Sequence, residues 1–280
     1  MQEKQEQPKA GESRRINTST TQLSVMKKRV DTTVNLKMES DSKYILSYGG
    51  GVNSTALIIF VVKNKFPLDH VVFSDTGDEM PETYEYLGVM RKYLKRKKIP
   101  FEIVRVRNKE SLSDRCLRRK VVPSQVWRWC TRDMKVAPIH AFYRTFKCHI
   151  YQYMGIDYDE FYRMKPAKPD YVSNLYPLVD HKIGREGCIQ LIKKAHLPIP
   201  VKSGCFFCPY NNMDRWKELY EKHPDLFKYA RKIEENGKHM PKQKLAPREY
   251  TLKKLEEELK QNKPLPMIHV ESPCGSECMV

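Results

Sequence analysis

The chain has 280 residues, of which 40% are hydrophobic and 30% are charged, and its formal net charge is +17 at pH 7. It contains no apolar run near the roughly 20 residues that a bilayer-spanning helix needs. No apolar signal core is present near its N-terminus either. These features argue against a membrane or secreted protein, and we expect a cytoplasmic one without a membrane partner.

The positive charge predicts an anionic partner, above all a nucleic acid (DNA or tRNA), because basic side chains neutralise phosphates with release of counterions. A basic surface without a specific partner is the alternative. The chain also has eight cysteines. In a cytoplasmic protein that number favours metal or redox chemistry over a disulfide framework.

The first 41 residues are polar, rich in Gln, Glu, Ser, Thr and Lys and nearly without aromatic side chains. Such a composition cannot bury enough apolar surface to offset the entropy of ordering, so we predict a disordered arm. We divide the chain into this arm (1–41), an α/β domain that includes the cysteine-bearing segment (42–210), a helical extension (211–260) and a flexible cysteine-bearing tail (261–280).

Short β-rich segments alternate with longer helical ones after the arm. The patterns predict strands at 43–48, 69–75, 101–106 and 149–156, and helices at 54–64, 80–98, 133–146, 214–236 and 251–263. Alternation of this kind predicts a parallel sheet with helices on both faces, a doubly wound α/β fold. Ligands of such sheets bind at the carboxyl ends of the strands.

Three consecutive glycines, Gly49–Gly51, follow the first predicted strand, and Asn53 or Ser54 can cap the helix that comes next. A glycine turn at a helix N-terminus suits an anion in both geometry and dipole, so the turn is a candidate phosphate cradle. A tight turn without a ligand is the alternative. The motif is neither a Walker A loop nor a G-x-G-x-x-G turn.

Two acidic segments also follow predicted strands, "SDTGDE" and "MGIDYDE". Asp75 in the first can cap its turn, bond a ribose hydroxyl or help to position Mg²⁺ on a pyrophosphate. Asp157 in the second allows the same alternatives.

Six stretches together resemble a known family: "SYGGGVNS", "SDTGDEMPETYEYL", "WCTRDMKVAPI", "GIDYDEFYR", "YPLVDH" and "HLPIPVKSGCFFCP". Their order and spacing are similar to those of the phosphoadenosine phosphosulfate (PAPS) reductase family, within the adenine-nucleotide PP-loop ATP pyrophosphatases. The resemblance implies a PP-loop domain that binds ATP or PAPS, with Mg²⁺. The residues that it assigns to the nucleotide are Ser47, Gly49, Gly50, Gly51, Asn53, Ser54, Asp75, Thr76, Gly77, Gly155 and Asp157.

The chain departs from the family pattern at several positions. Gly49 replaces the first serine of the PP-loop, and Asn53 replaces its aspartate. Asp157 stands where the sulfonucleotide reductases carry arginine, so a cation is missing where a phosphate or sulfate would lie. His181 replaces a tryptophan, and Trp129 replaces the first of two adjacent cysteines of the iron–sulfur relatives.

The cysteines of this region predict a metal centre. Cys205 and Cys208 form a C-x-x-C pair, which is a familiar ligand arrangement for a metal or a cluster. Cys130 matches the retained cysteine of the iron–sulfur relatives, and Cys188 is the nearest plausible fourth ligand. We expect these four to ligate a 4Fe–4S cluster. A structural zinc site and buried cysteines without a metal are the alternatives.

The last residues, "SPCGSECMV", contain Cys274 and Cys278. They resemble the catalytic cysteine on the mobile tail of sulfonucleotide reductases, and a thiolate there could attack sulfur. We therefore expect Cys278 and Cys274 to be catalytic. A redox disulfide, a ligand to the cluster and incidental cysteines on a disordered end are the alternatives.

The resemblance implies two enzymatic functions. In the first, which the basic composition, Asn53 and Asp157 favour, the enzyme adenylates a nucleic acid with ATP, and sulfur from a donor such as a cysteine desulfurase then displaces AMP. In the second, a tail cysteine reduces PAPS or adenylyl sulfate to sulfite, and thioredoxin resets the enzyme. A third possibility is a zinc-stabilised nucleic-acid-binding protein without enzymatic activity.

Overall fold

The computed structural model of the chain describes residues 42–125, 127–237, 244–247 and 250–265. The arm predicted for 1–41 lies outside these residues, as does most of the predicted tail, including Cys274 and Cys278. Within the described ranges, no helix is both long and apolar enough to span a bilayer.

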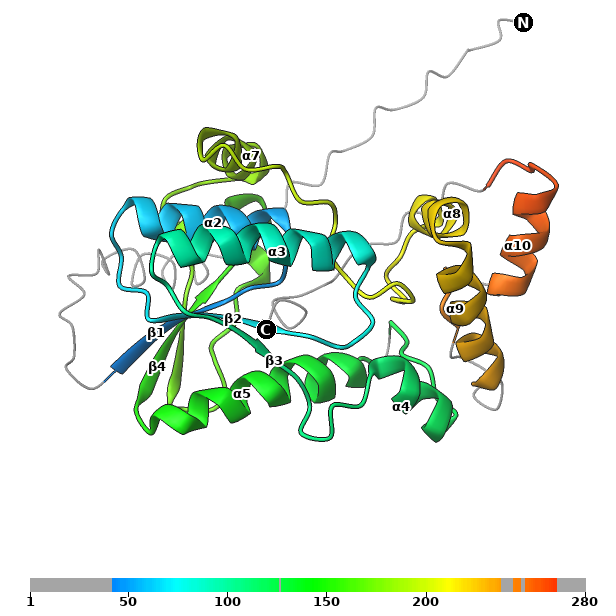
Figure 1. The fold of residues 1–280 in the computed structure, drawn as a ribbon, viewed down its shortest axis with the longest axis horizontal. Helices are drawn as coiled ribbons and strands as arrows, with labels where there is room; N and C mark the ends of the chain where they lie inside the picture. The colour runs from blue at the N-terminus through cyan, green and yellow to red at the C-terminus, as the bar shows by residue number, and fades with distance from the viewer. Residues whose placement is uncertain (1–41, 126, 238–243, 248–249, 266–280) are drawn as a thin grey trace, which may run out of the picture. The chain divides into compact units, whose positions relative to one another are not determined.

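Five parallel strands form one sheet in the order β3-β2-β1-β4-β5 (Figure 1). The strands are β1 (Ser42–Ser47), β2 (His70–Ser74), β3 (Phe101–Val104), β4 (His149–Met154) and β5 (Val172–Leu175). The chain moves outward from β1 to β3 and then returns to the other side of β1, so the direction of winding reverses between β1 and β4. This is the topological switch point at which open α/β sheets bind ligands. The predicted doubly wound fold is confirmed.

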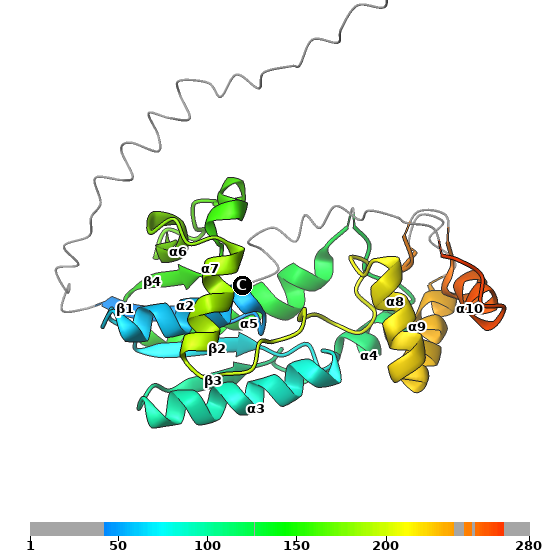
Figure 2. The same cartoon turned by 90° about the horizontal axis from the view of Figure 1, so that it is seen from above.

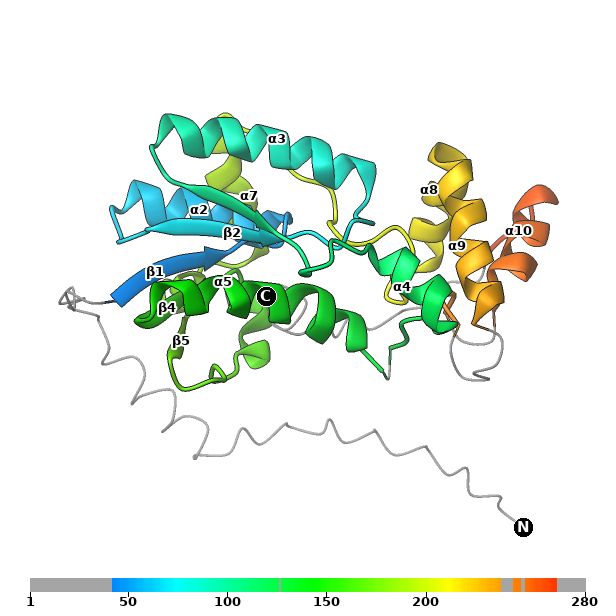
Figure 3. The same ribbon diagram turned by 60° about the horizontal axis from the view of Figure 1, so that its bottom comes forward.

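Helices cover both faces of the sheet, with α2, α3 and α7 on one face and α5 on the other (Figures 1 and 3). The helices are α2 (Val52–Lys63), α3 (Pro81–Arg96), α4 (Leu112–Arg119), α5 (Ala137–Tyr143), α6 (Pro177–Asp180), α7 (Arg185–Lys194), α8 (Met213–Lys222), α9 (Pro224–Asn236) and α10 (Leu252–Lys260). All residues of α2 from Val52 to Val61 are buried, because α2 lies between the sheet and α7. Because all sides of α2 are buried, apolar residues are found around its whole circumference.

Two predicted helices differ from the structure in their interior. The helix expected at 133–146 begins as a π-helical turn, Thr131–Val136, continues as α5 and ends in the 3₁₀ turn Arg144–Phe146. The helix expected at 214–236 is split into α8 and α9, because Pro224 has no N–H to donate and cannot continue α8.

The helices α8, α9 and α10 lie beyond the carboxyl ends of the strands (Figures 1 and 2). They share a second hydrophobic core with α4, built around Trp216, Phe227 and Leu255, all of which are less than 2% exposed. Cys205 and Trp129 belong to the same core. The C-terminal helices therefore pack against the cysteine-bearing segment through this core.

Candidate functional site

The glycine turn lies between β1 and α2. Gly50 has a φ of +77°, which a side chain would strain, and a Cβ on it would lie 3.2 Å from Cγ2 of Thr83. Gly51 is the N-cap of α2 and provides no side-chain cap. The prediction that Asn53 or Ser54 caps the helix is wrong, because both lie inside its first turn. The first N–H groups of a helix have no acceptor within it, so this turn presents backbone donors to a ligand.

Ser54 holds the turn in place from within. Its hydroxyl accepts a hydrogen bond from the N–H of Gly49 at 3.3 Å and donates one to the carbonyl of Gly51 at 3.2 Å. Gly155, after β4, packs directly against the same residue, since a Cβ on Gly155 would lie 2.8 Å from Cα of Ser54. Glycine at this position therefore lets the loop after β4 approach the start of α2.

Asp75 stabilises the turn after β2. One carboxylate oxygen accepts hydrogen bonds from the N–H of Gly77 and the hydroxyl of Tyr84, both at 2.8 Å, and the other binds the guanidinium of Arg105. Gly77 has a φ of +82°, which explains the glycine there. The sequence allows three roles for Asp75, and these contacts match the first, in which Asp75 caps its own turn.

Asp78 and Glu79 connect this turn to other segments. Asp78 accepts hydrogen bonds from the N–H of Ser113 at 2.6 Å and from its hydroxyl at 2.9 Å, so it caps the start of α4, and burial raises its pKa to about 6. Glu79 is 3% exposed. It accepts a hydrogen bond from Thr76 at 3.0 Å and pairs with Lys135 at 3.1 Å.

The loop after β4 leads into a 3₁₀ helix, Tyr158–Arg163, which Asp157 caps by accepting a hydrogen bond from the N–H of Glu160 at 3.1 Å. Burial raises the pKa of Asp157. Glu160 in turn accepts a hydrogen bond from Asn53 at 3.3 Å and pairs with Arg163. Arg185 donates to the side-chain oxygen of Asn53 at 2.9 Å. A polar network therefore joins α2 to this loop and to α7.

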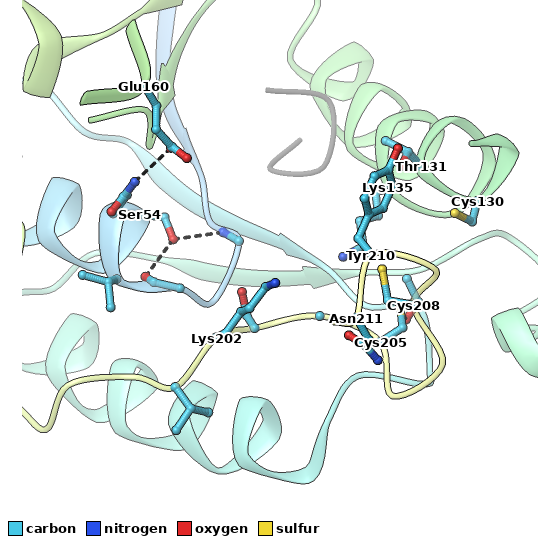
Figure 4. Close-up of a pocket in the computed structure, with 18 of the residues that line it drawn as sticks. Ser54, Cys130, Thr131, Lys135, Glu160, Lys202, Cys205, Cys208, Tyr210 and Asn211 are labelled. Atoms are coloured by element: carbon cyan, nitrogen blue, oxygen red, sulfur yellow. Dashed lines mark hydrogen bonds between the residues drawn. The ribbon is translucent and has the colours of Figure 1, made fainter. Parts of the chain in front are cut away.

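These segments surround a cavity of about 300 Å³, a size within the range of small-molecule sites. Figure 4 shows Ser54 of the glycine turn on one side, Cys205 and Cys208 on the other, and Lys202 between them. The lining includes Gly49, Gly51, Asn53, Ser54, Thr76, Cys130, Lys135, Glu160, Arg163, Arg185, Lys202, Ser203, Cys205, Cys208 and Asn211.

The cavity is positively charged. Among the described residues, four cations line it, Lys135, Arg163, Arg185 and Lys202, against one carboxylate, that of Glu160. The side chain of Arg163 is 9% exposed, and its Nε has no hydrogen-bond acceptor within the described part of the chain. Since buried polar groups are almost always hydrogen-bonded, the site favours an anionic ligand.

Cys205 and Cys208 lie on a loop that pairs with the segment after β2. The N–H of Met80 donates to the carbonyl of Gly204 at 2.9 Å, and the N–H of Phe206 donates to that of Asp78 at 3.0 Å. The sulfur of Cys205 lies 3.2 Å from the hydroxyl of Thr76, and burial raises the pKa of this thiol.

The structure does not assemble the expected four-cysteine site. Cys130, Cys205 and Cys208 line the cavity, but Cys188 lies on α7, buried among side chains that include Asp157, and burial raises its pKa to about 12. In the part of the chain that the structure describes, no three His, Cys, Asp or Glu side chains converge on a possible metal position. The four expected cysteines therefore do not meet at one point, and Cys274 and Cys278, the other candidate ligands, lie outside the described residues.

The described acidic side chains of this region also do not form a binding site for Mg²⁺. It binds through carboxylate and phosphate oxygens, but Asp75 is occupied by its own turn, and Asp157 caps the 3₁₀ helix. Neither lines the cavity. Glu160 does, yet it is engaged by Asn53 and Arg163.

Five of the predicted nucleotide-binding residues line the cavity: Gly49, Gly51, Asn53, Ser54 and Thr76. The other predicted residues do not line it: Ser47, Gly50, Asp75, Gly77, Gly155 and Asp157. Sequence reasoning missed the four cations. Arg163 ends the motif "GIDYDEFYR", Lys135 lies within "WCTRDMKVAPI" and Lys202 lies within "HLPIPVKSGCFFCP", so three of the four stand inside stretches already singled out.

Part of the chain is similar to known proteins. Residues 43–165 match the family model of the phosphoadenosine phosphosulfate reductase domain. A crystal structure of phosphoadenylyl-sulfate (PAPS) reductase from Candida auris, in its phosphate complex, is 14% identical, with 66% of this chain and 91% of that chain covered and a TM-score of 0.45. No curated protein matches the chain. The segment 43–165, which runs from β1 to just past the 3₁₀ helix at Arg163, is thus similar to the phosphoadenosine phosphosulfate reductase domain family.

Proposed function

We propose that the chain binds a sulfonucleotide, PAPS or adenylyl sulfate, and reduces its sulfuryl group to sulfite. One observation carries this proposal: a single cavity is lined by the glycine turn, by four cations and by three cysteines. A sulfonucleotide has its sulfur next to the 5′-phosphate. With that phosphate on the N–H groups of the glycine turn, the sulfuryl group points into a space lined by thiols.

The charges of the cavity support a sulfonucleotide over ATP with Mg²⁺. In the sequence, Asp157 stands where the sulfonucleotide reductases carry an arginine, and the loss of that positive charge argues against a reductase. In the structure, Arg163 and Arg185 bring cations to the cavity from neighbouring segments. The carboxylates that could hold Mg²⁺ are committed to other donors. Side chains rather than a metal ion would then neutralise the bound anion.

A second candidate is ATP-dependent sulfur transfer to a nucleic acid, with sulfur from a donor such as a cysteine desulfurase. The net charge of +17 favours it, and so do exposed aromatic side chains on a segment that contributes to the cavity. Phe161 is 41% exposed and Tyr162 is 72% exposed, on the same 3₁₀ helix that supplies Arg163. Exposed rings of this kind can stack with bases. Trp127, at 46% exposure, is a further platform, whereas Trp129 and Trp216 are buried.

The test compares substrates on protein purified without oxygen. PAPS and adenylyl sulfate are incubated with a dithiol, and sulfite is measured; ATP with Mg²⁺ is incubated with and without single-stranded RNA and DNA, and AMP and pyrophosphate are measured. Sulfite release supports the reductase. AMP with pyrophosphate, stimulated by nucleic acid, and no sulfite would replace it with the second candidate.

A pair of arginine variants connects the activity to the cavity. Arg163→Gln removes a buried cation from the lining and should raise the KM for the sulfonucleotide at least tenfold, since charge-assisted hydrogen bonds to phosphate are strong. Arg91→Gln changes an exposed residue of α3 and should leave KM unchanged. Equal KM values for the two variants would contradict the placement of the substrate.

A further inference from the structure

We propose that Cys205 and Cys208 form a redox pair that supplies both electrons for sulfite formation, so that sulfite leaves before any external thiol acts. This inference rests on the proposed function for its substrate. It concerns the C-x-x-C loop, which the sequence alone assigned to a metal.

The backbone brings the two cysteines within reach of each other. The N–H of Cys208 donates to the carbonyl of Cys205 at 3.2 Å, which closes a four-residue turn. The ends of such a turn are within about 7 Å in Cα distance, and disulfides join Cα atoms about 4.4–6.8 Å apart. Asn211 holds the turn by donating to the carbonyl of Phe206 at 3.0 Å. The Cα separation that this turn imposes is compatible with a disulfide between the pair.

The two thiols differ in their surroundings, and this difference suggests their order of action. Both line the cavity, but Cys208 is partly exposed, whereas Cys205 is 8% exposed. The thiol of Cys205 donates a hydrogen bond to Glu79 at 3.7 Å, and the ammonium of Lys135 pairs with the same carboxylate oxygen at 3.1 Å. Cys208 is thus placed to meet the substrate, and Cys205 is placed behind it with a proton acceptor.

The chemistry balances within the enzyme–substrate complex. The Cys208 thiolate attacks the sulfuryl sulfur, the bond from that sulfur to the 5′-phosphate oxygen breaks, and the phosphate leaves with the electron pair. Cys205 passes its proton to Glu79 and attacks the sulfur of Cys208, which forms the disulfide and expels sulfite. Sulfur gains two electrons, and the two thiols lose two. An external dithiol, such as thioredoxin or dithiothreitol, then reduces the disulfide.

The first test needs no nucleotide. The protein is equilibrated in mixtures of reduced and oxidised dithiothreitol, free thiols are alkylated, and tryptic peptides are weighed. Cleavage after Lys202 and Arg215 places both cysteines on peptide 203–215. We expect this peptide to switch reversibly between a doubly alkylated form and an internal disulfide. A peptide that stays alkylated, or a link from Cys205 to Cys130, would overturn the pair.

The second test is a single turnover of PAPS or adenylyl sulfate by pre-reduced protein without free thiol. Wild type should release one sulfite per chain and form the disulfide. Cys205→Ser should release none and retain a sulfite adduct on Cys208 until dithiothreitol is added, whereas Cys208→Ser should form no adduct. Cys148→Ser, at a partly buried cysteine that does not line the cavity, should match wild type.

The outcomes separate the inference from the function that it extends. If no sulfonucleotide reacts but peptide 203–215 still cycles, the proposed function fails and the pair stands. If wild type consumes the nucleotide but releases sulfite only after dithiothreitol, with peptide 203–215 still reduced, the pair is wrong and the function stands. Loss of sulfite release in Cys274→Ser/Cys278→Ser would also overturn the pair, as would tightly bound iron that Cys205→Ser abolishes.

Discussion

At Gly50 the backbone conformation and the available space both require glycine, whereas at Gly88 neither does. Gly50→Ala puts a side chain at a φ of +77° and within 3.2 Å of Thr83, and we expect it to lower the free energy of unfolding by about 1–3 kcal/mol. Nucleotide binding should weaken as well, because the turn must shift. Both quantities can be followed, by urea denaturation and by equilibrium binding of labelled nucleotide.

Gly88 provides the matched control for that variant. It is exposed in the middle of α3 and has open space around its Cα, so Gly88→Ala should stabilise the protein by about 0.5–1 kcal/mol and leave binding unchanged. Gly50→Ala with wild-type stability and affinity would mean that the turn is not held in the conformation described.

Asp78 should make stability depend on pH. Burial raises its pKa from 3.8 to about 6, so between these values the folded chain keeps a proton that the unfolded chain has lost. The free energy of unfolding therefore falls as the pH rises from about 4 to 6, and this contribution is constant above that window. Asp78→Asn keeps an acceptor for the N–H of Ser113 and cannot ionise. Relative to wild type, the free energy of unfolding of the variant should thus increase by up to about 3 kcal/mol between pH 4 and pH 7.

Denaturation of both proteins across this pH range measures the difference directly. High ionic strength screens surface charges but not the desolvation of a buried carboxylate, so the difference should persist in salt. A difference that does not change with pH would show that Asp78 is ionised throughout.

Single residues also show why the site was harder to predict than the fold. Gly49, Gly51 and Ser54 stand in a local motif, so the sequence predicts them as a group, and all three line the cavity. Arg185 comes from a separate segment and looks like an ordinary surface charge in the sequence, and Lys202 precedes the C-x-x-C pair with no pattern that marks it as a ligand. Their approach to the cavity depends on tertiary packing, which no local pattern records.

At the scale of elements, the sequence predicts most of the sheet and the helices at both ends of the chain, but it misses β5, α4, α6 and α7. The sequence predicts β1, β2, β3 and β4 within about two residues at most ends. It misses β5, a four-residue strand with Ser173 and Asn174 in its middle, because such a run lacks an apolar pattern. It also misses α4, although Ser111 and Asp114 form a capping box, which is a sequence signal for the start of a helix.

Glu234 connects two of the C-terminal elements. Buried on α9, it accepts hydrogen bonds from the N–H of Leu245 at 3.0 Å and from the N–H of Leu252, the first residue of α10, at 2.7 Å. Glu234→Ala leaves both donors buried and unpaired, so we expect a loss of about 2–4 kcal/mol in stability. Hydrogen exchange should become faster in α10 and not in the segments around the glycine turn.

The neighbouring residue supplies the control for this prediction. The side chain of Glu235 is 38% exposed and makes a 3.6 Å ion pair with Arg231. Glu235→Ala should therefore lower the free energy of unfolding by less than about 1 kcal/mol. Unchanged protection of α10 in Glu234→Ala would mean that apolar packing alone holds that helix.

For the whole molecule, the net charge of +17 has a consequence that the cavity does not account for. The first 41 residues carry eight basic and six acidic side chains, so most of the excess lies in the remainder of the chain. If this charge serves nucleic acid, affinity for a labelled single-stranded oligonucleotide should fall steeply with salt. Six neutralised phosphates on a single strand would lower the affinity roughly 300-fold between about 50 and 200 mM salt.

The aromatic side chains distinguish a nucleic-acid site from general attraction to a basic surface. Phe161→Ala/Tyr162→Ala removes two exposed rings from the 3₁₀ helix that carries Arg163. It should weaken oligonucleotide binding by about tenfold or more while leaving the slope of affinity against salt unchanged, because stacking releases no counterions. Ile103→Ala, at a 37% exposed residue of β3, serves as the control. Fluorescence anisotropy across a salt series measures both quantities. Equal affinities for the two variants, with the steep slope retained, would reduce the interaction to charge alone and remove the main structural support for a nucleic-acid substrate.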